Sequence, residues 1–471
     1  MKKVIFFIFL IVCIPLALPA IALEVKISGD RFTLHAEQVP LKDILQRLAD
    51  RGIKIYIDPQ LNPRITASFK DREIQRGLES ILKSLNHVLI WKSIEGPFGS
   101  LTRLEEIHVF RPGKKELIQS LTARSREIGK NPKDGSLFVK NEILLRLTNG
   151  IKLSDFKRFL QEIGGIVVDS NEVVGVFRII LPDESDVLGL IKRIKDYPVV
   201  AKAEPNYVYP IPHPYKNSDT SGYPEDMPND PLPEGAVPVA VIDTGLSQNA
   251  GLDRYVITSL DSLYPEEPIS DSLGHGTQMA MVAAGIIKPV GVSKNLTSFN
   301  PIIPIRAFDD NGQISNYDLM KSINFAIYNG AKVMSLSWGS ETSSNFLKDN
   351  LDYAASKGMI IVASAGNEPT GENVYPAAYG SVIGVGALNS EGKIWEKSNY
   401  GDFVTVYAPG IASFPIGYEG DPGTYAGTSI STAFIANLIA SYVSKNPNAT
   451  ISEILASLGE QESMEQNVNT N

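Results

Sequence analysis

The sequence predicts an α/β protein in which a large parallel-sheet domain follows two small α+β domains. In the C-terminal half, short and continuously apolar runs alternate with helical patterns, which is typical of a parallel sheet covered on both faces. Before it, two shorter stretches each mix helical periodicity with strand-like runs. The length of 471 residues suits about three domains, and 43% hydrophobic with 21% charged residues is a globular composition.

Charge and residue counts exclude several classes of function. The formal net charge of −9 argues against nucleic acid as the main partner, because phosphate binding needs a basic surface. One Cys and five His are too few for a disulfide framework, a zinc ribbon or a multi-histidine metal cage.

Residues 1–22 have the three parts of a secretory signal peptide. Lys2 and Lys3 precede an apolar run from Val4 to Leu18, and small residues follow up to Ala22, where we expect cleavage. The alternative is a membrane anchor, but a run of about 15 apolar residues is short for a span. No later stretch approaches the roughly 18 apolar residues of a membrane span. We therefore expect a soluble exported protein, periplasmic or extracellular, with no membrane span once the signal is removed. The single Cys13 would leave with the signal peptide.

Residues 23–113 form the first α+β domain. Helical spacing is expected for residues 41–48 and 74–85, and strands for residues 54–57, 65–69, 88–91 and 107–110. With Val39-Pro40-Leu41 before the first helix and Asp58-Pro59 after its strand, the unit resembles the short N-terminal domain of secretins and TonB-dependent receptors. That resemblance implies docking to a cell-envelope protein; the alternative is an ordinary spacer domain.

Two polar segments separate the remaining domains. Residues 114–140 are expected to be a loop-like linker. Residues 141–209 follow a β-α-β-β-α-β order, a split βαβ unit without a catalytic residue set of its own. Residues 210–235 contain seven prolines, which favours an exposed, extended segment that is a natural place for proteolytic processing.

Residues 236–458 form the parallel-sheet domain, and residues 459–471 are a polar tail. Buried strands are predicted at residues 239–242, 332–337, 360–365 and 382–386, and helices at 317–328 and 346–356. In such sheets, ligands bind at the carboxyl ends of the strands.

Two residues of this domain are candidates for acid–base chemistry. Asp243 directly follows a predicted strand and precedes a turn at Gly245. His275 lies between two glycines, ahead of a helical pattern over residues 279–285, and is the only histidine of the domain. It is therefore the only imidazole that could transfer protons near neutral pH here. Taken alone, His275 could equally be a loop or capping residue.

A serine and an asparagine complete the candidate set. Ser429 begins an apolar stretch that ends near Val443, and backbone N–H groups at a helix start favour an oxyanion beside it. Asn367 ends the run that starts at Ala363 and could direct its amide N–H₂ at the same oxyanion. Their ordinary roles would be a helix cap for the serine and a turn residue for the asparagine.

In the order Asp, His, Asn, Ser, these motifs resemble those of the subtilisin-like serine proteases, or subtilases. The resemblance covers nearly all of residues 236–458, and further stretches agree with it: Asp309 to Ser315, Gly330-Ala331, Ser337-Trp338-Gly339, Tyr375-Pro376-Ala377, Ser398-Asn399-Tyr400-Gly401 and Ala408-Pro409-Gly410. Residues 141–209 then resemble the subtilase propeptide, which acts as a folding template and an inhibitor.

The resemblance implies an exported serine endopeptidase made as a zymogen and acting on protein or peptide substrates. Ser429 would attack the peptide carbonyl, His275 would accept its proton, and Asp243 would orient the imidazole. Asn367 would stabilise the oxyanion. The backbone of Gly312 and of Ser337-Trp338-Gly339 would bind the substrate by strand addition.

Some positions depart from the family pattern. Ile430-Ser431 and Ala433 stand where subtilases usually have Met-Ala and Pro, and the segment before Val241 is shorter than usual. Calcium sites associated with that segment are therefore not expected, and we predict no metal and no cofactor. The alternative function is an envelope docking protein that carries an inactive or weakly active subtilase scaffold, which the intact set of four residues disfavours.

Overall fold

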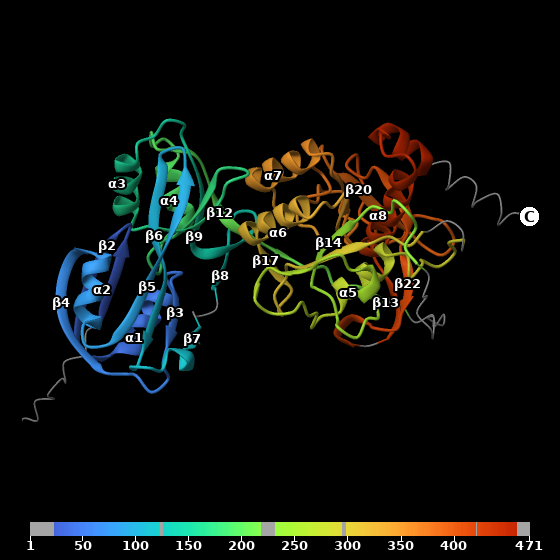
Figure 1. Ribbon diagram of the computed structural model, residues 1–471. Coiled ribbons are helices and arrows are strands. Elements are labelled where there is room, and N and C mark those ends of the chain that lie inside the picture. Colours follow the sequence, from blue (N-terminus) through green and yellow to red (C-terminus); the bar gives the residue numbers. More distant parts are fainter. Residues whose placement is uncertain (1–22, 123–125, 218–230, 294–297, 421, 459–471) are drawn as a thin grey trace, which may run out of the picture. The chain divides into compact units, whose positions relative to one another are not determined.

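The computed structural model describes residues 23–122, 126–217, 231–293, 298–420 and 422–458 (Figure 1). The expected signal peptide, the polar tail and part of the proline-rich segment lie outside this range. The chain divides into two compact units: Met1–Ile94, Ser100–Ser125 and Lys152–Val168 form the first, and the remaining residues form the second. Within the described residues, no helix has both the length and the apolar composition needed to cross a membrane.

The first unit contains two sheets with helices. Strands β1 (Glu24–Ser28), β2 (Arg31–Pro40) and β4 (Arg64–Glu73) form one; β5 (Asn86–Gly96), β6 (Gly99–Phe110), β3 (Lys54–Ile57) and β7 (Gln119–Leu121) form the other. Helices α1 (Leu41–Ala49) and α2 (Ile74–Leu82) bury the apolar stripes that the sequence predicts, including Leu41, Ile44, Leu45 and Leu48. The predicted helices and strands of residues 23–113 are therefore present.

Residues 114–140 differ from the predicted loop-like linker. They contain the short helix η1 (Lys115–Leu117), strands β7 and β8 (Ile128–Lys130), and the start of β9 (Leu137–Leu147). Strand β7 pairs with β3, and β8 pairs with β9, both antiparallel. Composition indicates a loop here, but pairing with strands elsewhere in the chain supplies the backbone hydrogen bonds that the local sequence does not reveal.

The β-α-β-β-α-β order of residues 141–209 is confirmed. Its elements are β9, α3 (Leu153–Ile163), β10 (Ile166–Asn171), β11 (Val176–Ile180), α4 (Val187–Ile194) and β12 (Val200–Pro210). Strand β9 pairs antiparallel with β11 on one side and with β12 on the other. Strand β12 also pairs antiparallel with β17 (Gln313–Ser315), so this sheet continues into the C-terminal domain.

The C-terminal domain is built on a seven-stranded parallel sheet. Its order is β15 (Leu260–Asp261), β16 (Ile302–Arg306), β14 (Val239–Asp243), β18 (Val333–Leu336), β19 (Ile360–Ser364), β20 (Ile383–Leu388) and β21 (Val406–Pro409). Alternate residues of β14 enter two separate cores: Val239 and Val241 pack with α5 and α8, whereas Ala240 and Ile242 pack with α6 and α7. Both faces are therefore covered, as the continuous apolar strands predict.

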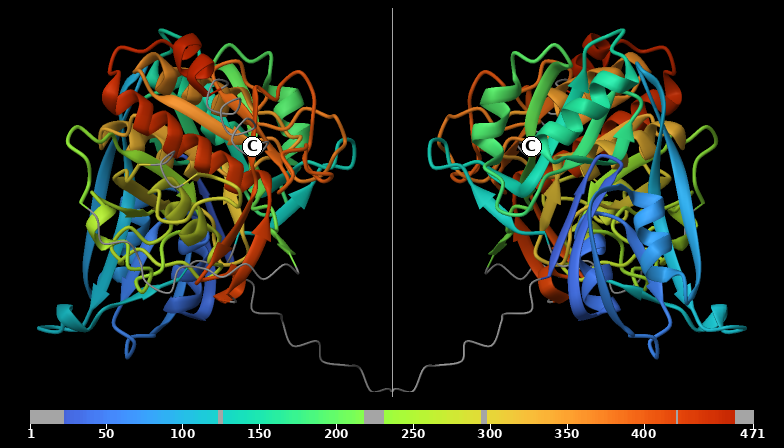
Figure 2. Two further views of the ribbon diagram at one scale, coloured as in Figure 1. Left: turned by 90° about the vertical axis from the view of Figure 1, so that its right-hand side faces the viewer. Right: turned by 90° about the vertical axis from the view of Figure 1, so that its left-hand side faces the viewer.

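The helices of this domain agree with the sequence pattern except at one start. Helices α6 (Asn316–Tyr328) and α7 (Asn345–Ser356) match the predicted ranges, and α8 (Thr428–Lys445) is the long red helix in the left view of Figure 2. Helix α5 (His275–Ala283) begins four residues before the predicted Met279, because Gly274 takes a positive φ of 82° and starts the helix there. Strands β13 (Tyr215–Asn217), β23 (Gly423–Ala426) and β22 (Ile411–Phe414) form a separate sheet. Short helices η2 (Asp253–Tyr255) and η3 (Tyr418–Gly420) and the helical residues 451–458 also belong to this domain.

Candidate active site

Asp243 and His275 form a buried hydrogen-bonded pair. Asp243 is the last residue of β14 and His275 the first of α5. The Nδ1 atom of His275 lies 2.7 Å from Oδ1 of Asp243, and each side chain is 1% exposed. The same Oδ1 accepts the N–H of Thr244 at 2.7 Å, and the Thr244 hydroxyl oxygen accepts the N–H of Gly276 at 2.7 Å. These bonds hold the carboxylate and the start of α5 in register.

The environment of His275 favours its charged form. Burial by itself lowers the pKa of an imidazole, but the negative charge of Asp243, its hydrogen bond and the charge of Asp271 outweigh burial and raise the pKa of His275 above its usual value. An imidazolium formed at this position is therefore stabilised.

Ser429 lies at the same edge of the sheet. It is the second residue of α8 and is 4% exposed. Its hydroxyl donates to the carbonyl oxygen of Ser337 at 3.0 Å, and the Ser337 hydroxyl donates to the carbonyl of Ser429 at 3.2 Å. Ser337 directly follows β18, which pairs in parallel with β14, so it shares a sheet edge with Asp243. The hydroxyl proton of Ser429 thus points to Ser337 in this structure.

Asn367 presents an unpaired amide donor beside Ser429. Its Oδ1 accepts both the N–H and the hydroxyl of Thr428, at 2.9 and 2.8 Å. Its Nδ2 is buried and has no hydrogen-bond partner among the described residues. A Cβ at Gly427 would lie 3.3 Å from Nδ2. Because the oxygen is held by the first residue of α8, the free N–H₂ is directed by the same turn that positions Ser429.

The predicted substrate-binding residues lie in two segments, one after β18 and one before β17. Ser337, Trp338 and Gly339 follow β18, and Trp338 is fully buried against Tyr209, with ring centroids 5.6 Å apart. Gly312 precedes β17, and its carbonyl accepts the N–H of Ile211 at 2.8 Å. A Cβ at Gly312 would meet Ile211 at 2.6 Å. The strand-addition edge predicted at Gly312 is therefore occupied by the chain itself.

At the start of the proline-rich segment, Ile211 is buried, whereas residues 212–216 are partly or fully exposed. Ile211 is only 4% exposed because it packs over Gly312. His213 then contacts Tyr418, with 3.0 Å between Nδ1 and the phenol oxygen. Tyr215 begins strand β13, which pairs with β23. Pairing on both sides of the site, rather than local composition, determines this conformation.

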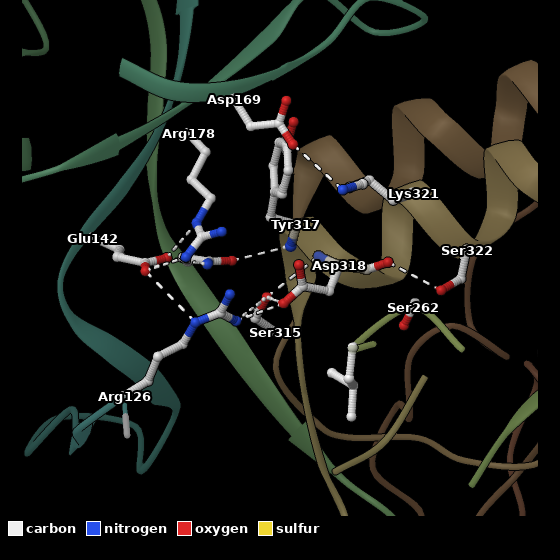
Figure 3. A network of polar contacts seen from close by, with 12 residues as sticks. Arg126, Glu142, Asp169, Arg178, Ser262, Ser315, Tyr317, Asp318, Lys321 and Ser322 are labelled. Carbon is white, nitrogen blue, oxygen red and sulfur yellow. Dashed lines mark hydrogen bonds and ion pairs between the residues drawn. The ribbon is translucent and has the colours of Figure 1, made fainter. Parts of the chain in front are cut away.

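A network of charged side chains joins Arg126, β9 and β11 to α6 (Figure 3), and all its members but Arg126 are largely buried. Arg178 binds Glu142 through two nitrogens, at 2.5 and 2.9 Å, and Arg126 binds Asp318 at 2.5 Å. Burial raises the pKa of Asp318, but the charges of Arg126 and Arg178 outweigh burial and hold it well below its usual value. Burial likewise acts against ionised Glu142, and Arg178 lowers its pKa overall. Both carboxylates are therefore ionised at neutral pH.

Two side chains of β12 contact the first turns of α6 and α7. The side-chain Oδ1 of Asn206 accepts the N–H of Tyr317 at 3.0 Å, and the Glu204 carboxylate accepts the N–H of Asn345 at 3.1 Å and the hydroxyl of Ser344 at 2.7 Å. These contacts satisfy helix N-terminal donors. Sequence reasoning missed them. The available signal was a pair of polar residues, Glu204 and Asn206, at alternate positions of a predicted strand.

No group of three or more His, Cys, Asp or Glu side chains arranged to hold a metal ion occurs among the described residues.

Two family patterns match this chain. The Subtilase family pattern matches residues 234–467, and that of the fervidolysin N-terminal prodomain matches residues 127–206. The thermophilic serine proteinase of Bacillus sp. (strain AK1) is 29% identical over 322 residues, covering 66% of this chain and 80% of that protein. Subtilisin of Bacillus pumilus is 32% identical over 225 residues, covering 46% of this chain and 80% of that protein.

A solved structure extends the similarity beyond the catalytic domain. Fervidolysin from Fervidobacterium pennivorans, described as a keratinolytic enzyme related to subtilisin, aligns with a TM-score of 0.53 and 25% identity, covering 69% of this chain and 57% of that chain. The prodomain match begins at residue 127, within the segment that the sequence predicts to be a linker. The chain belongs to the subtilase family of serine endopeptidases and carries a fervidolysin-like prodomain before its catalytic domain.

Proposed function

We propose that Ser429 is the nucleophile of this endopeptidase, His275 its general base and Asp243 the residue that orients the imidazole. The observation that carries this assignment is the buried 2.7 Å bond between Asp243 and Nδ1 of His275. With Nδ1 held by the carboxylate, Nε2 is the ring nitrogen left to exchange a proton with substrate-side groups.

The reaction requires the Ser429 hydroxyl to leave the Ser337 carbonyl. His275 then accepts the hydroxyl proton as Oγ attacks the peptide carbonyl. The unpaired Nδ2 of Asn367 and the backbone N–H of Ser429 then donate to the oxyanion. His275 returns the proton to the leaving amine, and water repeats the sequence on the acyl-enzyme.

The full-length chain is the zymogen in this proposal. The Ile211 N–H occupies the Gly312 carbonyl, and β12 occupies the edge of β17, so a substrate cannot add a strand there until the prodomain leaves. Glu204 and Asn206 hold the first turns of α6 and α7, which supports the folding-template role. Maturation would cut within residues 210–235, part of which lies outside the described residues.

Export and docking complete the proposal. The signal-like residues 1–22 support export to the periplasm or the extracellular space. The helix and strand pattern of residues 23–113 supports a domain of the secretin/TonB short N-terminal type, which would dock to a cell-envelope protein. The alternative, a docking protein with an inactive subtilase scaffold, is disfavoured by the held imidazole and the free amide of Asn367.

A fluorophosphonate probe tests the assignment. We expect covalent labelling of the processed protein and none in Ser429→Ala. Ser431→Ala is the matched control, because its hydroxyl is committed to the carbonyl of Ala408 at 2.8 Å. The Ser429→Ala chain should also stay uncut between Tyr209 and Gly235, as read by mass spectrometry of its N-terminus. Wild-type protein that is processed but takes no label would refute the nucleophile assignment.

A further inference from the structure

Residues 211–217 pass along the candidate active site from one strand edge to another. Ile211 pairs with Gly312 on the side of β17. His213 contacts Tyr418, whose Cα lies 3.7 Å from the Cβ position of Gly274, the residue before His275. Tyr215 pairs with Ala426, three residues before Ser429. If residues 211–217 follow the path of a substrate, the peptide bond presented to the site lies between Ile211 and Tyr215, and Tyr215 is on its C-terminal side.

Tyr215 contacts two side chains that the catalytic machinery does not use. Its ring meets Trp395 edge to face, with centroids 5.5 Å apart and planes at 74°. The ammonium of Lys397 lies 4.3 Å from the centre of the same ring. An aromatic edge and a cation over one ring are the two contacts that aromatic faces favour most. We call Trp395, Lys397 and the adjoining edge of β23 the Tyr215 site.

The Tyr215 site is rigidly attached to the catalytic domain. The N–H of Trp395 donates to the carbonyl of Ala387 in β20 at 2.9 Å, and the N–H of Ala387 donates to the Ser398 hydroxyl at 3.0 Å. Trp395 is 6% exposed and packs with Ala387 and Ala426. The site is thus fixed to the central sheet and to the strand that leads into Ser429.

We propose that the Tyr215 site binds an aromatic side chain of the substrate on the leaving-group side of the cleaved bond. In the zymogen, Tyr215 occupies it; after processing, a substrate strand adds to β23 in the place of β13. The proposal rests on the proposed function, because it takes residues 211–217 to follow the path of a substrate.

Chemistry sets the preferred ligand. A Tyr or Phe ring gains from both the Trp395 edge and the Lys397 cation, whereas Leu can gain only apolar contact. A Lys or Arg at this place would meet the ammonium of Lys397 and is disfavoured. The Tyr215 site therefore selects for aromatic residues and against basic ones. This selection does not depend on the part of the substrate that pairs with β17.

Matured enzyme and internally quenched peptides test the proposal. One Tyr is moved through the four positions after the cleaved bond of an otherwise fixed peptide, and kcat/KM is measured for each against Ala. We expect a single position at which Tyr exceeds Ala by about tenfold, equal to about 1.4 kcal/mol. Trp395→Leu should reduce that ratio below about twofold, and Lys397→Met should reduce it about threefold.

Matched controls lie in the same turn. Ile394 is 54% exposed beside Trp395, and Lys393 pairs with exposed Glu391. Ile394→Ala and Lys393→Met should leave the Tyr-to-Ala ratio unchanged, and Trp395→Phe should retain most of it. A ratio near one at all four positions, or one that survives in Trp395→Leu, overturns the proposal while leaving the protease assignment intact.

A second measurement needs no activity. In the full-length Ser429→Ala chain, Tyr215→Ala should speed amide hydrogen exchange in β13 and β23, because the strand loses its ring contacts. Exchange that is unchanged there refutes the Tyr215 site even if every peptide proves inert, an outcome that would separately count against the proposed function.

Discussion

Breaking the Arg178–Glu142 ion pair should release the prodomain from α6. Both charges are buried: the side chains are 15% and 4% exposed, and two hydrogen bonds join them. Removing one partner of such a pair costs about 3–5 kcal/mol, because the other charge is left without compensation. Glu142 keeps two other partners, because Arg126 lies 3.8 Å from it and Asn206 donates to its carboxylate at 2.7 Å. The free-energy cost of Arg178→Ala should therefore lie at the lower end of that range, at about 3 kcal/mol.

The amide of Tyr317 reports this loss directly. Its hydrogen bond to Asn206 crosses from α6 to β12, so it exchanges with solvent only when the two separate. A loss of about 3 kcal/mol corresponds to exchange faster by about 100-fold, measured by hydrogen exchange in the Ser429→Ala background to prevent self-cleavage.

A control and a rescue variant sharpen the reasoning. Lys140 pairs with Glu127, but both are well exposed, so Lys140→Ala should change the Tyr317 exchange rate less than about threefold. Replacing both partners, as in Glu142→Gln with Arg178→Met, should restore much of the protection, because neither charge of the pair is left without its partner. Equal effects of Arg178→Ala and Lys140→Ala would refute the argument that burial gives this pair its strength.

The remaining predictions concern the catalytic step. Asn367→Ala should lower kcat by about 10²–10³ with little change in KM, because in the proposed mechanism its free N–H₂ donates to the developing oxyanion and not to the bound substrate; an equal rise in KM would contradict that role. The pKa of His275 is raised, and catalysis needs the neutral imidazole, so kcat/KM should fall as pH drops through a midpoint above 6.5. In Asp243→Asn, that midpoint should move down and kcat should fall by about 10⁴; a pH–rate profile whose midpoint does not move would refute the pairing.

Part of the catalytic domain could be predicted from local pattern. Strands β14, β18, β19 and β20 are apolar runs that the sequence predicts, whereas β15, β16 and β21 of the same sheet were not predicted. The helices have clear starts, such as Ser315 before α6, whose hydroxyl accepts the N–H of Asp318. Asp243 follows a strand and Ser429 begins a helix, and both positions could be found because polar residues at element ends interrupt apolar runs. The roles assigned to them remain proposals.

Features that depend on distant partners could not be predicted. Arg126, Glu142 and Arg178 are scattered charges in the sequence, and only burial together with Asp318 makes them a network. Nothing in the local sequence distinguishes Trp395 from other apolar residues, and only the tertiary structure shows its contact with Tyr215. The same holds for β7 and β8, whose polar residues indicate a loop until β3 and β9 pair with them.

By itself, the sequence determined the class of fold, the order of elements and the four candidate active-site residues, because periodicity and element ends are local properties of the chain. Only the tertiary structure decided which hydrogen bonds these residues make, which charges are buried together and where residues 211–217 run. Those properties depend on contacts between segments up to about two hundred residues apart, as in the bond between Arg126 and Asp318, and no local pattern encodes them.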